Sequence, residues 1–387
     1  MNYITTTEAL AAFCTLAAKH SYVTVDTEFL RERTYYSKLC LLQLAYPGPG
    51  PGDDSAALVD PLVEGLSLEP LYDLFRNPGV VKVFHAARQD LEIFCVDAGV
   101  IPAPLFDTQV AAMVCGFGEQ AGYETLVRKI AKAEVDKSSR FTDWSRRPLT
   151  EAQMVYALAD VTHLRLVYEY LAARLAKNGR ERWVAEEMAV LNDPATYRTD
   201  PDEAWQRVKT RTTSARFLGI VRELARFRES YAQTRDVPRS RVYKDDALVE
   251  LASTKPLTEA DLGRSRLLLR EGRRGEIADG ILAAVKAALA LPVDQLPKAE
   301  KDREQMQVNP ALADLLRVLL KAKSESLGVA SKLIASAADL DALAAGDRDM
   351  PCLHGWRLEA FGDDALRLCK GEIALTAAGN EVRVIRL

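Results

Sequence analysis

Two acids at the end of an apolar strand constrain this chain more than any other feature. The run Tyr22–Val25 indicates a buried β-strand, and Asp26 and Glu28 follow it with one residue between them. Side chains two residues apart on a strand point to the same side, so both carboxylates face one place. We therefore expect Asp26 and Glu28 to belong to a single site.

Two further segments carry acids in favourable positions. Asp90 begins a predicted helix, Asp90–Val96. Tyr156 and Asp160 lie in Glu151–Tyr170, whose apolar spacing predicts a helix, and residues four apart on a helix share a face. If the four carboxylates converge, their mutual repulsion requires cations. Oxygen ligands suit Mg²⁺ or Mn²⁺, and two such ions about 3.5–4 Å apart stabilise an in-line phosphoryl displacement.

The order of these motifs resembles that of a known family. VDTEF, FHAARQDLEIF and DWSRRPLTEAQMVYALADVTHLRLVY are similar to the three exonuclease motifs of the DEDD superfamily, whose tyrosine branch is marked by Tyr-x-x-x-Asp, here Tyr156 and Asp160. The stretches DTEFLRERTYYSKLCLLQLA, LFDTQVAAMV and DKSSRFTDWSRRPLT narrow the resemblance to ribonuclease D, a family that trims RNA from the 3′ end. It extends from about Tyr22 to Arg174 and, more weakly, over the helical remainder.

The resemblance implies a role for each of five residues. Asp26 would bridge two divalent cations, and Glu28 and Asp160 would complete the first cation site. Asp90 would hold the second cation, partly through water. Tyr156 would position the nucleophilic water by a hydrogen bond, because a phenol with an ordinary pKa of about 10 is a poor base.

Several neighbouring residues leave alternatives open. His85 follows a predicted strand, where a hydrogen-bonded structural role competes with a metal or acid–base role. Asp107 is expected to cap a helix. Trp144 and Phe141 would either stack on a base or pack in the core. Basic side chains flank the third motif and would either contact RNA phosphates or pair with local acids: Lys137, Arg140, Arg146 and Arg147.

Alternating strands and helices predict an α/β fold. Consecutive strands followed by crossover helices imply a mixed sheet with helices on both faces, an order that resembles the ribonuclease-H-like fold of DEDD exonucleases. The predicted strands are Tyr22–Asp26, Leu39–Ala45, Ala56–Val59 and Val80–Phe84, and the predicted helices include Leu68–Phe75, Asp90–Val96 and Thr108–Val114.

The N-terminal segment and the cysteines favour a cytoplasmic protein. Thr5-x-x-Glu8 indicates a capping box that opens a helix over Ala9–Ala18, which is too short to span a bilayer and lacks a basic leader. The six cysteines show no CxxC spacing, so we expect reduced thiols and no zinc site.

Proline-rich and charged connectors divide the 387 residues into three expected domains. Residues 1–191 form the exonuclease domain, and residues 204–290 and 306–387 form two all-α domains. Val237–Ala252 aligns without gaps with Val329–Ala344, and the apolar residues of the two segments fall at matching positions. In this context both segments resemble the helicase-and-RNase-D C-terminal (HRDC) domain, a small nucleic-acid-binding module. The second copy departs from the pattern, because Val329 is followed by Ala330 rather than proline and the segment is less basic.

The charge of the chain is unevenly distributed. Trp205–Arg274 holds 17 Lys and Arg against 9 Asp and Glu, a charge of +8. Because the net charge of the whole chain is −4, the remaining residues carry −12. Such a basic module is suited to binding a polyanion.

The resemblance implies a metal-dependent 3′→5′ exoribonuclease that releases nucleoside 5′-monophosphates from structured RNA precursors, chiefly tRNA. We expect a monomer without a membrane partner. The alternatives are a 3′→5′ exodeoxyribonuclease and an RNA-binding scaffold without catalysis.

Overall fold

The computed structural model describes residues 2–48, 54–136, 142–212, 214–297 and 308–387. The chain forms two compact units. The first, here called the sheet unit, comprises Met1–Phe29, Leu39–Thr196 and Gln305–Leu387; the second, the helical unit, comprises Leu30–Lys38 and Tyr197–Glu304. The three domain boundaries expected from the sequence stay a prediction.

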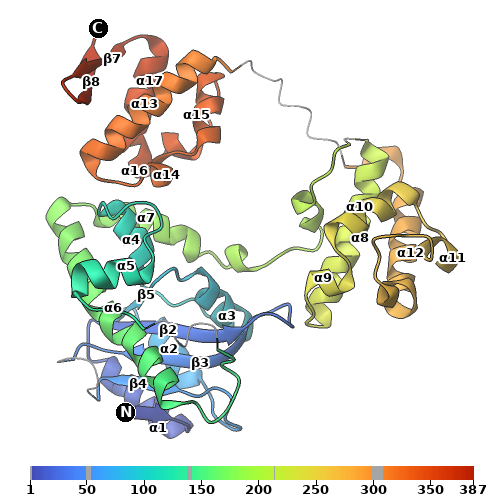
Figure 1. Ribbon diagram of the computed structural model, residues 1–387, viewed down its shortest axis with the longest axis horizontal. Coiled ribbons are helices and arrows are strands. Elements are labelled where there is room, and N and C mark those ends of the chain that lie inside the picture. Colours follow the sequence, from blue (N-terminus) through green and yellow to red (C-terminus); the bar gives the residue numbers. More distant parts are fainter. Residues whose placement is uncertain (1, 49–53, 137–141, 213, 298–307) are drawn as a thin grey trace. The chain divides into compact units, whose positions relative to one another are not determined.

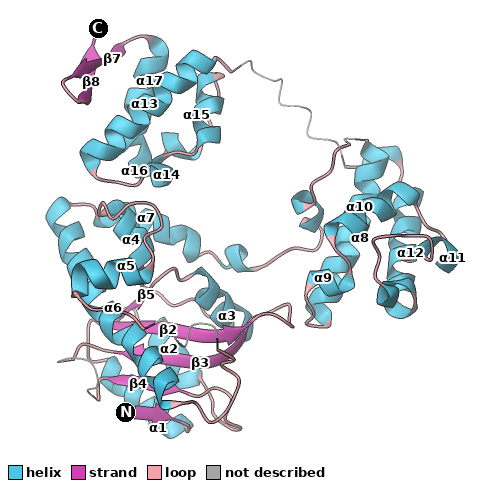
Figure 2. Ribbon diagram, viewed as in Figure 1, coloured by secondary structure: helices cyan, strands magenta, loops and turns pink. Residues whose placement is uncertain are grey.

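A mixed six-stranded sheet forms the centre of the sheet unit, and Figure 2 shows helices around it. The strand order is β1-β4-β3-β2-β5-β6, in which β3 and β4 are antiparallel and the pairs β1–β4, β2–β5 and β5–β6 are parallel. The strands are β1 (Asn2–Ile4), β2 (Tyr22–Leu30), β3 (Lys38–Ala45), β4 (Ala56–Val59), β5 (Val81–Phe84) and β6 (Leu105–Asp107). This confirms the expected mixed sheet.

Helices cover this sheet, and their ends follow local capping chemistry (Figure 1). Thr6, rather than the predicted Thr5, caps the first helix by accepting the Ala9 N–H at 3.2 Å. The predicted capping box is therefore wrong, because the residue three positions after the cap is an alanine, which cannot return a hydrogen bond. The helices are α1 (Thr7–Ala17), α2 (Glu69–Arg76), α3 (Arg88–Ala98), α4 (Thr108–Val114), α5 (Tyr123–Leu126), α6 (Glu151–Asn178) and α7 (Glu181–Leu191).

The long helix α6 is tied to β2. A capping box between Thr150 and Gln153 starts the helix, and Gly179, at φ 63°, ends it in the left-handed conformation that glycine favours. The Thr24 hydroxyl, fully buried on β2, lies 2.8 Å from the Val161 carbonyl oxygen of α6. The Tyr22 hydroxyl donates to Glu169 of α6 at 2.5 Å. These bonds fix the helix along the strand that carries Asp26 and Glu28.

The helical unit includes a loop from the sheet. Its helices are α8 (Ala215–Thr234), α9 (Arg239–Val242), α10 (Asp245–Thr254), α11 (Glu259–Leu262) and α12 (Gly275–Ala290). The β2–β3 loop packs here: the backbone N–H groups of Tyr35 and Tyr36 both donate to Asp236 at 3.0 Å. The Tyr35 hydroxyl donates to Glu229 and accepts from Arg239 at 2.8 Å.

The C-terminal segment repeats part of this pattern inside the sheet unit. Its elements are α13 (Pro310–Leu327), α14 (Ser331–Ile334), α15 (Ala337–Ala344), α16 (Gly355–Arg357), α17 (Asp363–Lys370), β7 (Ile373–Ala378) and β8 (Glu381–Arg386). In the alignment of Val237–Ala252 with Val329–Ala344, α9 matches α14 and the starts of α10 and α15 coincide. Strands β7 and β8 form an antiparallel pair of their own.

This segment packs against α7. The Trp183 and Trp356 rings stack with centroids 4.7 Å apart, and the Trp356 indole N–H donates to Glu187 at 2.8 Å. Arg357 donates to the other oxygen of Glu187, also at 2.8 Å. Among the helices that the structure describes, none is long and apolar enough to cross a membrane.

Candidate active site

Three of the predicted carboxylates converge. One oxygen of each of Asp26, Glu28 and Asp160 lies within 4.8 Å of the others. Asp26 and Glu28 come from one face of β2, and Asp160 comes from the middle of α6. Strand periodicity and the α6–β2 bonds together produce this cluster.

Asp90 lies next to this group but outside it. Its side chain is 7% exposed in the first turn of α3, and its Oδ1 accepts a hydrogen bond from the Thr27 hydroxyl. Burial and the nearby charge of Asp26 raise the pKa of Asp90 well above its ordinary value. Asp90 therefore shares the electrostatic environment of the three clustered acids.

Burial and mutual repulsion raise the pKa values of the clustered carboxyl groups. Burial, then the charges of Asp26, Asp160 and Asp90, raise the pKa of Glu28 to about 9. Burial raises the pKa of Asp160 to about 7, although a hydrogen bond from Tyr156 opposes the shift. Burial and Asp160 raise the pKa of Asp26 as well. An all-oxygen cluster that is costly to ionise alone has the properties of a site for hard divalent cations.

Tyr156 faces the cluster as a protonated phenol. Its hydroxyl hydrogen-bonds to the Asp160 carboxylate, and burial, followed by the charge of Asp160, raises its pKa above the ordinary value. Trp144 lies behind it, 2% exposed, with ring centroids 6.0 Å apart. Of the two alternatives for Trp144, core packing is the one observed.

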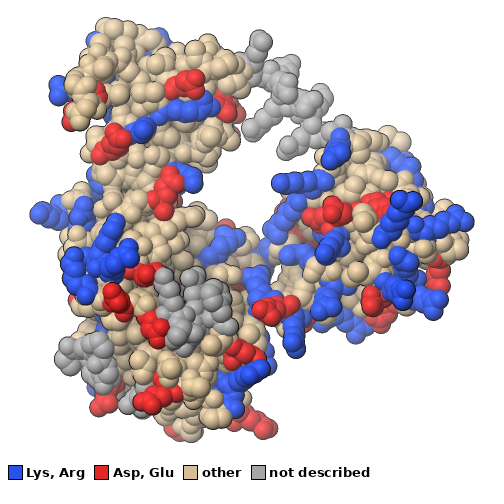
Figure 3. Space-filling model, in the orientation of Figure 1, with Lys and Arg blue, Asp and Glu red and all other residues tan. Residues whose placement is uncertain are grey.

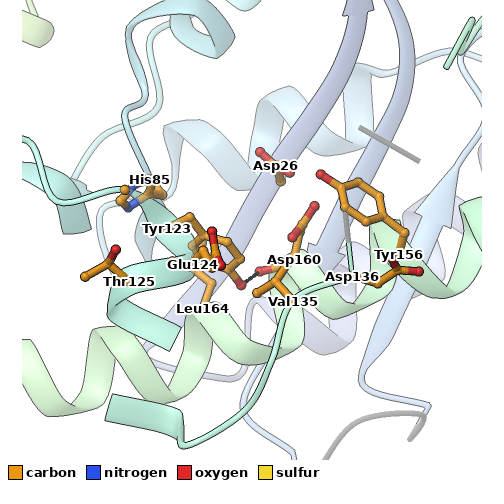
Figure 4. Close-up of a pocket in the computed structure, with 11 residues that line it drawn as sticks. Asp26, His85, Tyr123, Glu124, Thr125, Val135, Asp136, Tyr156, Asp160 and Leu164 are labelled. Atoms are coloured by element: carbon orange, nitrogen blue, oxygen red, sulfur yellow. Dashed lines mark hydrogen bonds between the residues drawn. The ribbon is translucent and has the colours of Figure 1, made fainter. Parts of the chain in front are cut away.

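A pocket of about 280 Å³ opens beside the carboxylates. In Figure 4, His85 and Tyr156 lie at opposite ends, with Asp26 and Asp160 between them. Tyr123, which the sequence analysis missed, lines this pocket from α5 and donates its hydroxyl to the Asp160 backbone carbonyl. It belongs to a four-residue helix without apolar periodicity, so no sequence signal marked it.

Comparisons with known proteins agree with this geometry. A 3′-5′ exonuclease family model matches residues 1–176, and the HRDC domain model matches residues 217–285. Ribonuclease D of Jannaschia sp. is 62% identical over 99% of both chains. The chain belongs to the ribonuclease D family.

Other members of the family extend the similarity to the whole chain. Ribonuclease D of Granulibacter bethesdensis is 50% identical over 99% of this chain and 96% of its own. The crystal structure of Escherichia coli RNase D, described as an exoribonuclease involved in structured RNA processing, matches with a TM-score of 0.81 at 29% identity. The match covers 96% of this chain and 99% of that one. The chain is therefore a 3′→5′ exoribonuclease with the ribonuclease-H-like fold.

Two residues near the ribonuclease D motifs have structural partners. Arg147 makes two bonds to Asp60, the residue that follows β4, at 2.6 and 2.7 Å, and a third to the Cys40 carbonyl at 2.6 Å. Arg147 therefore pairs with an acid, but this acid is Asp60, 87 residues away in the sequence, and not an acid beside the third motif. Asp107 caps α4 as expected, since it accepts the Gln109 N–H at 2.8 Å. Three residues with open alternatives lie outside the described ranges: Lys137, Arg140 and Phe141.

Proposed function

We propose that this exoribonuclease trims the 3′ ends of structured RNA precursors, chiefly tRNA, in the cytoplasm as a monomer, and releases nucleoside 5′-monophosphates. The observation that carries the metal-dependent chemistry is the convergence of Asp26, Glu28 and Asp160 in a desolvated cluster with raised pKa values. The pocket beside it accepts the 3′ end.

The carboxylates would hold two divalent cations. Asp26, Glu28 and Asp160 would be ligands of these ions, and Asp90, beside the cluster, would also serve as a ligand. Their oxygen atoms favour Mg²⁺ or Mn²⁺ over softer metals. Bound ions lower the pKa of a water molecule and neutralise charge on the attacking and leaving oxygens.

Tyr156 orients the attacking water. Because its pKa is raised, the hydroxyl keeps its proton and acts through a hydrogen bond rather than as a base. Tyr123 supports the same region, since its bond to the Asp160 carbonyl holds α5 against α6.

The helical unit holds the body of the RNA. Many of its cations are neutralised within the unit, as Arg228 is by Asp245 at 2.7 Å and Arg239 by Glu229 at 2.5 Å. Figure 3 shows Lys and Arg spread over the visible face of this unit. Exposed cations that make no ion pair with a described acid include Arg241, Lys244, Lys255, Arg270 and Arg274. Such charges are free to contact phosphates, and the HRDC match covers all five.

The direct test incubates the full chain with a 3′-extended tRNA, with and without Mg²⁺ or Mn²⁺. The expected result is stepwise shortening from the 3′ end and release of nucleoside 5′-monophosphates only with metal. Asp26→Asn is the inactive control. Shortening in a metal chelator contradicts the cation mechanism. Faster degradation of a matched DNA strand supports the exodeoxyribonuclease alternative instead.

A further inference from the structure

His85 is held rigidly at the edge of the pocket, although the proposed hydrolytic steps do not use it. Its Nδ1 lies 3.0 Å from the Thr108 hydroxyl, and its ring packs against Tyr123 with centroids 5.5 Å apart. The next residue, Ala86, has a φ of 57°, a left-handed conformation that is unfavourable for a residue with a side chain. Asp107 maintains this conformation by accepting the Ala86 N–H at 3.0 Å.

The hydrogen-bond network assigns the tautomer of His85. The Thr108 hydroxyl has one proton and donates it to the Phe84 carbonyl at 3.0 Å, so it accepts from His85. The proton of the neutral imidazole therefore sits on Nδ1, and Nε2 carries a lone pair. Burial lowers the pKa of His85, which keeps the ring neutral at neutral pH. Within the described residues, Nε2 has no hydrogen-bond partner from the protein.

The unpaired Nε2 acceptor of His85 can bind only those groups of a nucleic acid strand that donate a hydrogen bond. Phosphate oxygens are acceptors only, so they gain nothing from a neutral ring with a lone pair. A metal role is disfavoured, because His85 lies outside the carboxylate cluster and the hard cations prefer oxygen. Among groups that every ribonucleotide carries, the 2′-hydroxyl is the internal donor, and DNA lacks it.

We propose that His85 is a specificity-determining residue that accepts a hydrogen bond from a ribose 2′-hydroxyl of the bound 3′ end. The inference rests on the proposed function, in which the pocket takes the 3′ end of the RNA. Thr108 and Asp107 act through His85 by fixing its ring and its backbone.

The test uses the full chain and RNA oligonucleotides that carry one 2′-deoxy nucleotide at the last, second-last or third-last position. With the wild-type chain, kcat/KM should fall about tenfold at one of these positions, the effect of losing about one hydrogen bond. A 2′-fluoro nucleotide there should give the same fall, since fluorine cannot donate but preserves the ribose-like pucker.

Two variants separate the acceptor from the packing. In His85→Asn the amide reaches the Nδ1 position and keeps the Thr108 contact, so the enzyme should fold but lose the discrimination. In His85→Gln the amide oxygen reaches the Nε2 position and should restore part of it. Equal falls in wild type and His85→Asn overturn the proposal, as does a 2′-fluoro substrate that behaves like RNA. Failure to shorten the all-ribose oligonucleotide would instead contradict the proposed function.

Discussion

The carboxylates of the site repel one another when they are ionised. Removing one should therefore lower turnover but should not lower the stability of the metal-free protein. We predict that Asp26→Asn, Glu28→Gln, Asp90→Asn and Asp160→Asn each lower turnover by at least about a hundredfold, because each removes charge that holds metal at the transition state.

Thermal unfolding in a chelator should show an unchanged or higher Tm for the same variants, because repulsion in the apo site is relieved. Near-wild-type turnover in Asp26→Asn would contradict its assignment to both cation positions.

Tyr156 should tolerate substitution better than the acids. Tyr156→Phe deletes the hydroxyl that bonds to Asp160 but keeps the ring beside Trp144. We predict slower hydrolysis with metal affinity close to that of the parent, measured by single-turnover kinetics and calorimetric titration. Loss of metal binding in this variant would mean that the phenol supports the cations rather than the water.

At the residue scale, the sequence predicts which side chains share a site when their spacing follows the period of a helix or a strand. Asp26 and Glu28 share a strand face, and Asp160 lies one turn after Tyr156, so each pair is encoded locally. Tyr123 reaches the site through a tertiary contact with the Asp160 carbonyl, which no local period encodes.

At the scale of elements, the predicted strands and helices differ from the observed ones mainly in length. Strand β2 continues past Asp26 to Leu30. The prediction ended too early because Asp26, Thr27 and Glu28 interrupt the apolar run. Strands β1 and β6 were not predicted, since three residues are too few for an alternating pattern to show. Strand β7 and its pairing with β8 were not predicted either.

The Arg147–Asp60 pair links the third motif to β4, and its strength should depend on pH. Burial raises the pKa of Asp60, but hydrogen bonds from Arg147 and Tyr3 lower it to a net value below the ordinary one. A lowered folded pKa contributes stability above the ordinary carboxyl value of about 3.9, and this contribution is lost as the pH falls through the folded pKa.

We therefore predict that Asp60→Asn lowers the free energy of unfolding by about 2 kcal/mol at neutral pH. The difference from the parent should shrink as the pH falls below about 3.9. Urea unfolding at several pH values measures both. Asp73→Asn is the matched control, because its ion pair with Arg76 is exposed and should contribute little to stability. A pH-independent loss at Asp60 would rule out the charged pair as the cause.

The contact of α7 with the C-terminal segment should contribute strongly to stability. Trp356 is fully buried against Trp183, so Trp356→Ala should cost about 3–5 kcal/mol in urea unfolding. Trp356→Phe keeps an aromatic ring but removes the donor to Glu187, so its cost should be smaller.

The control for that contact is Glu359→Ala. It breaks the exposed pair between Arg182 of α7 and Glu359 of the C-terminal segment, and should change the free energy of unfolding little. Equal costs for Trp356→Ala and Glu359→Ala would mean that this packing does not stabilise the unit.

At the scale of the whole molecule, RNA affinity should depend on the unpaired cations of the helical unit. On single strands the log–log salt slope changes by about 0.7 for each phosphate contact. Replacing Lys255, Arg270 and Arg274 with Gln should weaken tRNA binding and flatten the slope by up to about 2, while turnover of short oligonucleotides stays near that of the parent.

The matched control for tRNA binding removes a cation that is already neutralised. Arg235 donates to both oxygens of Glu276 at 2.7 Å, so changing the two residues to Gln together leaves the net charge unchanged. Binding isotherms across a salt series should match the parent for this pair. An unchanged slope in the triple variant would mean that other groups hold the RNA.

The β2–β3 loop is made long before the residues that secure it. Glu229 follows Tyr35 by 194 residues, so a ribosome adding about 5–20 residues per second needs roughly 10 to 40 s to supply it. During that interval β2 and β3 have both emerged, Asp26 and Glu28 with them, while the tyrosines of the loop lack their partners. Closure of this loop is therefore a late event in the synthesis of each molecule, and the nascent chain exposes Tyr35 to chaperones and proteases until α8 and α9 arrive.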